Sequence, residues 1–268
     1  MAEATTTAAG HRTGPIPPTG RTAGRRARLT GAVAATGVLL VGWQIAAAGL
    51  PELVLPSPVE TSAALARIAG DGSLSGQLLV TVGRTLAGTA VGVAVGVLLG
   101  GLAARSAFAD GLLAPVQLVL TGFPPVVTVV ILMIWLGPGG TAAVCAVVAV
   151  VVPQAMVATR DAVRRIDPQL LEMCAAFAVP SGRRLRHVVV PAAAPPIVTA
   201  VAVSLAGGLR LTLMAEVIAA STGIGAAVAS ARGNLDTAEV FAWALIAVVF
   251  AALVDRLVLR PVRRRFDP

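Results

Sequence analysis

Long uninterrupted apolar runs are the feature that most constrains how this chain can fold. Several of them reach the roughly 20 residues that a helix needs to cross the hydrocarbon of a bilayer. Only 13% of the 268 residues are charged and 56% are hydrophobic, far from the balance of a soluble domain. Backbone polar groups inside a membrane are satisfied by helices. The sequence therefore predicts an all-α membrane protein with six spans, near residues 29–49, 76–104, 112–136, 140–159, 192–219 and 239–260.

The placement of arginine predicts the orientation of these spans. All 21 basic residues are arginines, and most precede the first span, follow the second, surround the loop at 160–186 or follow the last span. Cytoplasmic flanks carry an excess of positive charge, so we expect both termini in the cytoplasm. Trp43, Trp135 and Trp243 then fall near outer ends of spans, where interfacial tryptophans gather. The net charge of +8 indicates contact with anionic lipid headgroups and no nucleic acid partner.

The chain is expected to be one membrane domain with two short tails. Residues 1–28 are predicted to be a disordered basic cytoplasmic tail, residues 29–260 the transmembrane domain, and residues 261–268 a basic cytoplasmic tail. The alternative at the N-terminus is a cleaved secretory signal, with Arg25-Arg26 before an apolar run and Ala46-Ala47-Ala48 as the cleavage site. The apolar run is longer than a signal core, which favours a retained span.

Several chemistries are excluded by residues that the chain lacks. There is no lysine, so neither a Gly-x-x-x-x-Gly-Lys nucleotide loop nor a Schiff base can form. Cys145 lies in a predicted span and Cys174 in the cytoplasmic loop, and with His11 and His187 they make no plausible zinc site. We expect no catalytic residue, no metal and no cofactor in this chain. It is not expected to be an enzyme.

Ionisable residues inside spans are the usual pointers to a transport path; Arg84 lies near the start of the second span, and Arg210 and Glu216 lie in the fifth. A charge at the bilayer centre costs roughly 2.5–3.5 kcal/mol, so Arg210 should face protein or water. Arg210 and Glu216 are about 9 Å apart along one helix and on different faces, which makes them poor partners. Arg84 and Glu216 both fall toward the outer side and could pair. Either these residues line a path for an anionic solute, or they make structural contacts between helices. The structural interpretation is favoured for Glu216, and both remain open for Arg210.

Glycine and proline mark two further features of the spans. Gly88, Gly92 and Gly96 repeat every four residues, a stripe that predicts close packing of the second span against another helix. A Gly-Phe-Pro-Pro run at 122–125 interrupts the third span. Freed carbonyls at such a break line a cavity or meet another helix; core packing is the simpler interpretation.

A polar loop at 167–191 separates two apolar blocks. Asp167 is predicted to cap a short helix whose first turn holds Pro168. Residues at helical spacing give this helix one apolar face, made of Leu170, Met173, Cys174 and Phe177. After the break at 180–182, Ser181 is predicted to cap a second helical piece carrying Arg183, Arg184 and Arg186. A capped helix on the cytoplasmic surface suits docking, whereas composition alone allows an ordinary basic loop.

The spacing within this loop resembles the EAA motif of permease subunits in binding-protein-dependent ABC importers. In that family a Glu-Ala-Ala opening is followed by Gly, and about a dozen residues later by an aliphatic residue and Pro. Here Glu172 fills the acidic position, Ala178 stands where Gly is usual, and Val190-Pro191 closes the motif. Met173 and Cys174 replace the two alanines. This departure affects how well the loop would fit its partner.

Other segments resemble the branch of that family that imports nitrate, sulfonates, taurine or thiamine precursors. They occur in the family's order over roughly residues 51–260, and they are Leu55-Pro56-Ser57-Pro58, Thr81 through Arg84, Phe123-Pro124-Pro125, Ile134-Trp135-Leu136-Gly137, Asp167-Pro168, Ala215-Glu216 and Gly223-Ile224-Gly225.

The resemblance implies a type I ABC importer-like permease in the bacterial plasma membrane, with a translocation path for a small anionic solute and a coupling helix at about 168–179 in a loop at about 161–191. Two permeases, identical or similar, would pair above two separate ATP-binding subunits that bind the ATP. An extracytoplasmic solute-binding protein would deliver the solute to outer loops including Leu53–Ile68 and Gly223–Ala238. The residues implied in coupling are Asp167, Pro168, Glu172, Ala175, Ala176, Phe177, Ala178, Val190 and Pro191.

Two other classes of function stay open at this point. One is an ion-coupled secondary carrier with Arg210 and Glu216 as coupling groups, although the sequence shows no inverted repeat. The other is a membrane scaffold whose central loop binds a partner that is not an ATPase.

Overall fold

A computed structural model describes residues 21–259 and 261–262, and this part of the chain is helical without any strand. The chain divides into a unit up to Ala46 and a larger unit from Ala47. The first unit holds most of α1 (Arg21–Ala48), which begins before residue 29, the expected start of the first span. Alanine and arginine are strong helix formers, which accounts for the earlier start. Residues 1–20 and 263–268 of the two expected tails lie outside the described residues.

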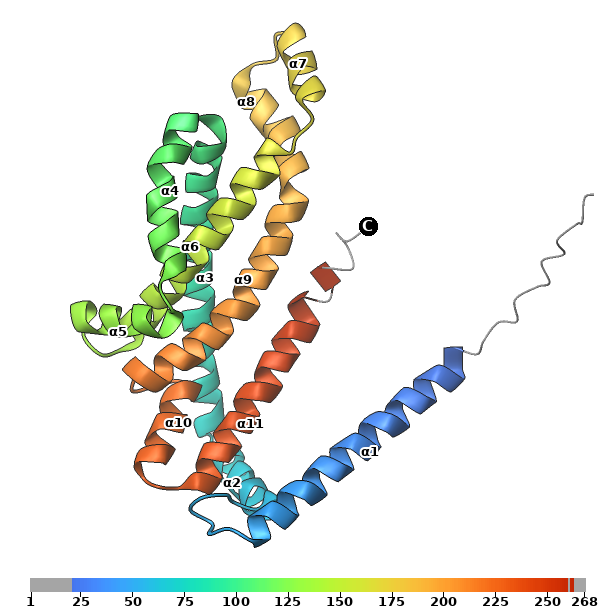
Figure 1. Ribbon diagram of the computed structural model, residues 1–268, viewed down its shortest axis with the longest axis vertical. Helices are drawn as coiled ribbons and strands as arrows, with labels where there is room; N and C mark the ends of the chain where they lie inside the picture. Colours follow the sequence, from blue (N-terminus) through green and yellow to red (C-terminus); the bar gives the residue numbers. More distant parts are fainter. Residues whose placement is uncertain (1–20, 260, 263–268) are drawn as a thin grey trace, which may run out of the picture. The chain divides into compact units, whose positions relative to one another are not determined.

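The larger unit consists of helices connected by short turns (Figure 1). Its elements are α2 (Pro58–Gly70), α3 (Ser73–Arg105), α4 (Ala107–Gly122), α5 (Pro125–Leu136), α6 (Gly140–Arg164), α7 (Pro168–Ala176), α8 (Ser181–Arg184), a π-helical turn η1 (Leu185–Val189), α9 (Val190–Ala219), α10 (Ile224–Gly233), α11 (Thr237–Val254) and a second π-helical turn η2 (Asp255–Leu259). Within this unit, α7, α8 and the turn between α3 and α4 lie at one end, and α2 and α10 lie at the other (Figure 1).

Four helical segments in the described residues are long and apolar enough to cross a membrane, and α4 with α5 makes a fifth if the bent pair is one span. They correspond to all the expected spans except the first. In α1 the stretch whose side chains are described without a gap, Ala34–Ala48, is an apolar helix shorter than these segments. The count of six spans, and the side that each terminus faces, therefore stay predictions.

The third expected span, 112–136, is two helices and not one interrupted helix. The axes of α4 and α5 differ by 100°. Phe123 and Pro124 both have extended backbone, and Pro125 starts α5. A proline forces the residue before it out of the α region and supplies no N–H, so two consecutive prolines end α4 and permit the turn. The sequence located the break but not its angle.

The glycine stripe of α3 packs against α6, as predicted. A Cβ on Gly88 would lie 2.8 Å from Cβ of Val147, closer than real Cβ atoms come. The same crowding holds at Gly92, Gly96 and also Gly100, which extends the stripe by one further turn. Only glycine lets the two backbones approach this closely.

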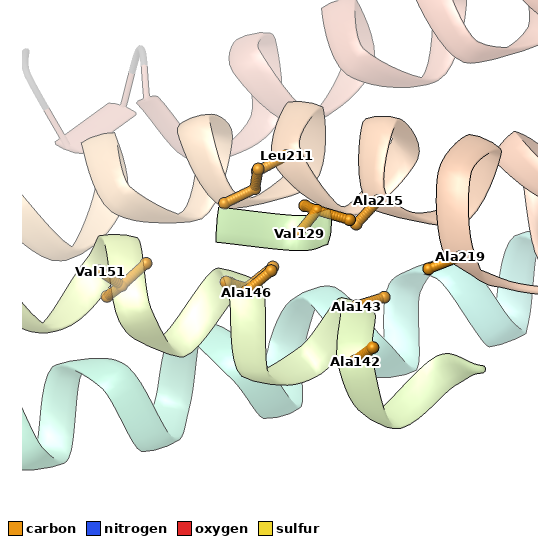
Figure 2. Packing of buried hydrophobic residues seen from close by; sticks show 9 residues of the cluster. Val129, Ala142, Ala143, Ala146, Val151, Leu211, Ala215 and Ala219 are labelled. Carbon is orange, nitrogen blue, oxygen red and sulfur yellow. The ribbon is translucent and has the colours of Figure 1, made fainter. Parts of the chain in front are cut away.

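The main core joins α5, α6 and α9. Val129 of α5 lies beside Leu211 and Ala215 of α9 (Figure 2). The buried side chains from α6 are almost all alanine or valine: Ala142, Ala143, Ala146, Val147 and Val151. Small side chains allow these helices to pack closely where lipid offers no hydrophobic driving force.

A second core, at the opposite end from α7, joins α2, α10 and α11. It contains Ala64, Ile68, Ile224, Ala238, Ala242 and Trp243. A capping box starts α2: Ser57 Oγ accepts from the Glu60 N–H at 3.2 Å, and the Glu60 carboxylate accepts from the Ser57 N–H at 2.6 Å. This explains in physical terms the Leu-Pro-Ser-Pro segment of the sequence.

Candidate functional site

The helix α7 begins as the sequence predicted. The Asp167 carboxylate accepts a hydrogen bond from the Gln169 N–H at 2.9 Å, and Pro168 is the first helical residue. Together they satisfy one of the backbone donors that a helix start leaves free. Local contacts therefore define the start of this short helix, and the hydrogen bonds described next define its end.

The end of α7 is a Schellman motif with an alanine in the left-handed position. Ala178 has φ of 51°. The Val179 N–H donates to the Cys174 carbonyl at 2.9 Å, and the Ala178 N–H donates to the Ala175 carbonyl at 2.9 Å. A left-handed residue is normally glycine. The geometry thus gives the reason for glycine at this place in the EAA motif.

The predicted apolar face of α7 divides into a buried and an exposed part. Cys174 is buried, 6% exposed, against its own chain. Leu170, Met173 and Phe177 are exposed, and Phe177 has 77% of its surface accessible. Glu172, Ala175, Ala176 and Ala178 are exposed on the same helix and the turn after it. This exposed set, Leu170, Met173 and Phe177, is called the α7 apolar surface below.

The second helical piece differs from the expectation in two ways. Ser181 is the first residue of α8 and not its cap, because Pro180 holds the cap position with extended backbone. The helix also does not stop: it passes through η1 into α9. Within η1 the Val190 N–H donates to the Leu185 carbonyl, five residues back. Pro191 has no N–H for the His187 carbonyl, which accounts for a wider turn here. Arg183, Arg184 and Arg186 are exposed.

At the opposite end of the unit, Glu216 of α9 forms an ion pair with Arg84 of α3. The Arg84 Nη1 lies 2.8 Å from Glu216 Oε1, and the Glu216 side chain is wholly buried. The Thr81 hydroxyl donates to the same carboxylate at 2.8 Å, and the Gly225 N–H donates at 3.1 Å. A buried charge is tolerated only when it is paired and hydrogen-bonded, and Glu216 meets both conditions.

The same residues of α3 fasten the loop between α9 and α10. Arg84 Nη2 donates to Thr222 Oγ1 at 2.7 Å, and Thr81 Oγ1 accepts from the Ile224 N–H at 2.9 Å. Gly223 has φ of 105°, and a Cβ there would collide with the Glu216 carboxylate. Three of the family-like segments, those containing Arg84, Glu216 and Gly223, therefore meet at one place.

Arg210 lies apart from this pair. It is exposed on α9, and within the described part of the chain it makes no hydrogen bond or ion pair. The expectation that Arg210 and Glu216 do not pair is confirmed. Val203 and Gly207 are exposed on the same stripe of α9, so a lone cation sits on an otherwise apolar face.

Sequence reasoning named Arg84 and Glu216 and allowed their pairing, but it missed Thr222. Threonine in a short loop is common, and no spacing in the sequence connects it to α3. Proximity to the Gly-Ile-Gly segment was the one available signal.

A family model described as "Binding-protein-dependent transport system inner membrane component" matches residues 92–268. The chain belongs to this family. It is a multi-pass permease of the bacterial inner membrane, and its family is a class of transport components and not of enzymes.

Curated relatives cover most of this permease. It is 32% identical to the riboflavin transport system permease protein of Chloroflexus aurantiacus, over 83% of this chain and 87% of the relative. It is 28% identical to the taurine transport system permease protein of Escherichia coli, over 86% of each chain. Its fold is similar to a chain of the inward-facing MetNI methionine ABC transporter, with a TM-score of 0.61 at 18% identity, covering 71% of this chain and 94% of that one.

Proposed function

We propose that this permease forms the path of an ATP-driven importer for a small anionic solute, and that α7 couples it to separate ATP-binding subunits. The observation that carries the coupling role is the α7 apolar surface. Phe177, at 77% exposed, extends from a helix that is capped at both ends and so has a defined shape. Exposed aromatic residues on a rigid element are the usual anchors of protein interfaces. Glu172 and the nearby arginines would guide the contact.

The chain connections around α7 suit the transmission of force. On one side Arg165, Ile166 and Asp167 alone join α6 to α7, and on the other α8 and η1 continue without a break into α9. Ile166 is buried. A displacement of α7 would therefore move two of the spans that build the core. Closure of the ATP-binding subunits would switch the path between inward-facing and outward-facing states, a rigid-body mechanism. ATP is bound by those subunits, since this chain has no lysine for a nucleotide loop.

Arg210 supports an anionic solute. A cation exposed on a span is costly beside lipid and is best explained by a partner that the chain itself does not supply. Taurine, named for one relative, carries a sulfonate that would suit a guanidinium. The path would form between this permease and a second one, identical or similar.

The end of the unit that holds α2 and α10 is where an extracytoplasmic solute-binding protein would deliver the solute. Residues of α2 and of the loop before α11 line a groove there, among them Glu60, Arg67, Leu235 and Asp236. The Thr237 hydroxyl ties the two sides together by donating to the Leu53 carbonyl at 2.8 Å.

The test replaces Phe177 by alanine in the permease expressed with its ATP-binding subunit. We expect co-purification of that subunit to fall by about tenfold or more, the effect of removing an interface anchor of at least 1.4 kcal/mol. Phe108→Ala is the matched control, because Phe108 is 80% exposed near the same end but lies on α4. Undiminished co-purification with Phe177→Ala, or uptake that survives depletion of ATP, would contradict the proposal.

A further inference from the structure

The helix α4 is weakly held within its unit. None of its 16 residues is buried. It joins α3 through Ser106 alone, and at its other end the chain turns by 100° into α5, whose Val129 belongs to the core. Its apolar side chains are half-buried at most, as at Leu113 and Leu120, or exposed, as at Leu118 with 72% of its surface accessible, so none is fixed in a core. The contacts that hold α4 in place are therefore at its ends.

At the end nearest α7, Asp110 of α4 bridges two arginines of α6. Asp110 Oδ1 lies 3.2 Å from Arg160 Nη1, and Asp110 Oδ2 lies 3.0 Å from Arg164 Nη2. Arg160 and Arg164 are four residues apart and so share one face of the helix. The same Arg164 Nη2 donates to the Ala103 carbonyl in the last turn of α3 at 3.1 Å. The ends of α3, α4 and α6 thus meet on one set of polar contacts, called the Asp110 bridge below.

This bridge is better placed than a single surface ion pair. The side chains of Asp110 and Arg160 are only 27% and 21% exposed, that of Arg164 is 44% exposed, and each carboxylate oxygen has its own arginine. Asp110 also lies in the first turn of α4 and Arg164 in the last turn of α6, where each charge is favoured by its helix dipole. A network with these features holds a fixed geometry where an isolated exposed pair does not.

The bridge lies a few residues along the chain from α7. Only Arg165 and Ile166 separate Arg164 from Asp167, the cap of α7. The chain between Arg164 and Asp167 can reach at most about 11 Å even when extended. A movement of α7 therefore displaces Arg164, and through it the carboxylate of Asp110.

We infer that Asp110 is a positioning residue that makes α4 follow the end of α6 when the coupling loop moves. The inference rests on the proposed function of α7 and adds a second route by which its movement spreads. Through α6 and α9 the movement enters the packed core. Through the Asp110 bridge it reaches α4, which no buried contact would otherwise carry along. Without the bridge, ATP hydrolysis would proceed while α4 lags behind.

The experiment uses the complete importer, with its ATP-binding subunits and binding protein, reconstituted in liposomes. For Asp110→Asn we expect ATP hydrolysis within about twofold of wild type and uptake about tenfold lower, so that solute moved per ATP falls, within the range by which such residues modulate coupling. Asp161→Asn is the matched control, because among the described residues the Asp161 side chain pairs only with Arg160 of its own helix and so does not join α6 to α4. Asp110→Glu should restore most of the ratio.

Each result decides the matter. An unchanged ratio in Asp110→Asn overturns the inference, and so does an equal fall of uptake and hydrolysis, which would indicate a role in assembly only. If Asp110→Asn does not assemble, Arg160→Gln, which removes one of the two arms, must show a smaller loss of the same ratio or the inference fails. Normal binding of the ATP-binding subunit by Phe177→Ala would instead overturn the proposed function.

Discussion

At the scale of single residues, Ala178, which stands where the family usually has glycine, shows that a departure from a family pattern has a measurable cost in free energy. Its left-handed backbone costs an alanine about 1 kcal/mol relative to a residue without a Cβ. The turn forms nonetheless, because two backbone hydrogen bonds close it. The chain therefore keeps the geometry of the motif at the expense of some local stability.

Ala178→Gly is expected to stabilise α7 by about 1 kcal/mol. The measurement is amide hydrogen exchange in α7, because a local turn is better detected by local opening than by global melting. Ala175→Gly is the control with the opposite sign: Ala175 lies inside the helix, where glycine costs about 1 kcal/mol. Faster exchange in Ala178→Gly would show that the left-handed turn is not as described, and slower exchange in Ala175→Gly would show that Ala175 is not inside a helix.

The Arg84–Glu216 pair makes a second prediction at this scale. Arg84→Gln leaves a buried carboxylate without its cation and should destabilise the permease by about 3–5 kcal/mol. The double variant Arg84→Gln with Glu216→Gln should recover part of that loss, which a double-mutant cycle of thermal stability measures. Arg67→Gln is the comparison, since its pair with Asp236 spans 3.6 Å and Arg67 is 63% exposed; we expect a loss below about 1 kcal/mol. Simple additivity of the two single losses would contradict the pairing.

Arg84 and Glu216 could be predicted from the sequence because few charged residues fall inside apolar runs. Their positions within these runs placed both residues toward the outer side. Because buried charges need a partner, a pair between the two was possible. The contact of Arg84 with Thr222 and the Asp110 bridge could not be predicted from the sequence. Both depend on which helix ends meet in space, and no periodicity in the chain encodes that.

At the scale of helices, the stripe of glycines determines how closely α3 and α6 approach. Gly96→Val is expected to force the two helices apart and cost about 1–3 kcal/mol, because a Cβ at this position would lie 2.6 Å from Cβ of Ala155. Gly101→Val is the matched control, since nothing lies within 4 Å of a Cβ there. Thermal unfolding of the two purified variants tests this. Equal melting temperatures would mean that the contact between α3 and α6 is looser than the structure has it.

The helices also show where sequence reasoning ends. A four-residue spacing of glycines is a local pattern, so the stripe was predictable, and so were the cap at Asp167 and the break at 122–125. The 100° turn between α4 and α5 was not, because proline permits a range of directions and packing of Val129 into the core selects one. The same holds for η1, where Pro191 requires a departure from the α-helix but does not specify a π turn.

At the scale of the whole molecule, the distribution of charge separates the two ends of the permease. Within the unit from Ala47, α7, α8 and the α3–α4 turn lie at one end, and the arginines at the end of α3, at the end of α6 and in α8 belong to these elements: Arg105, Arg160, Arg164, Arg165, Arg183 and Arg184 (Figure 1). The positive-inside rule alone predicted this grouping. The surface that would pair with the proposed second permease could not be predicted, since an apolar face toward lipid and one toward another subunit have the same composition.

Arg210 belongs to this scale because its partner, as proposed, lies outside the chain. Arg210→Gln should lower uptake of a sulfonate such as taurine by about tenfold, the loss of one hydrogen bond to a charged group, while the complex assembles normally. Arg210→Lys keeps the charge but cannot donate two parallel hydrogen bonds to the sulfonate. Its uptake should therefore lie between those of wild type and Arg210→Gln. Arg105→Gln is the control: it removes another exposed arginine, at the end of α3, and should leave uptake unchanged. If Arg210→Gln transports the sulfonate like wild type yet assembles poorly, then the cation holds the second permease and not the solute.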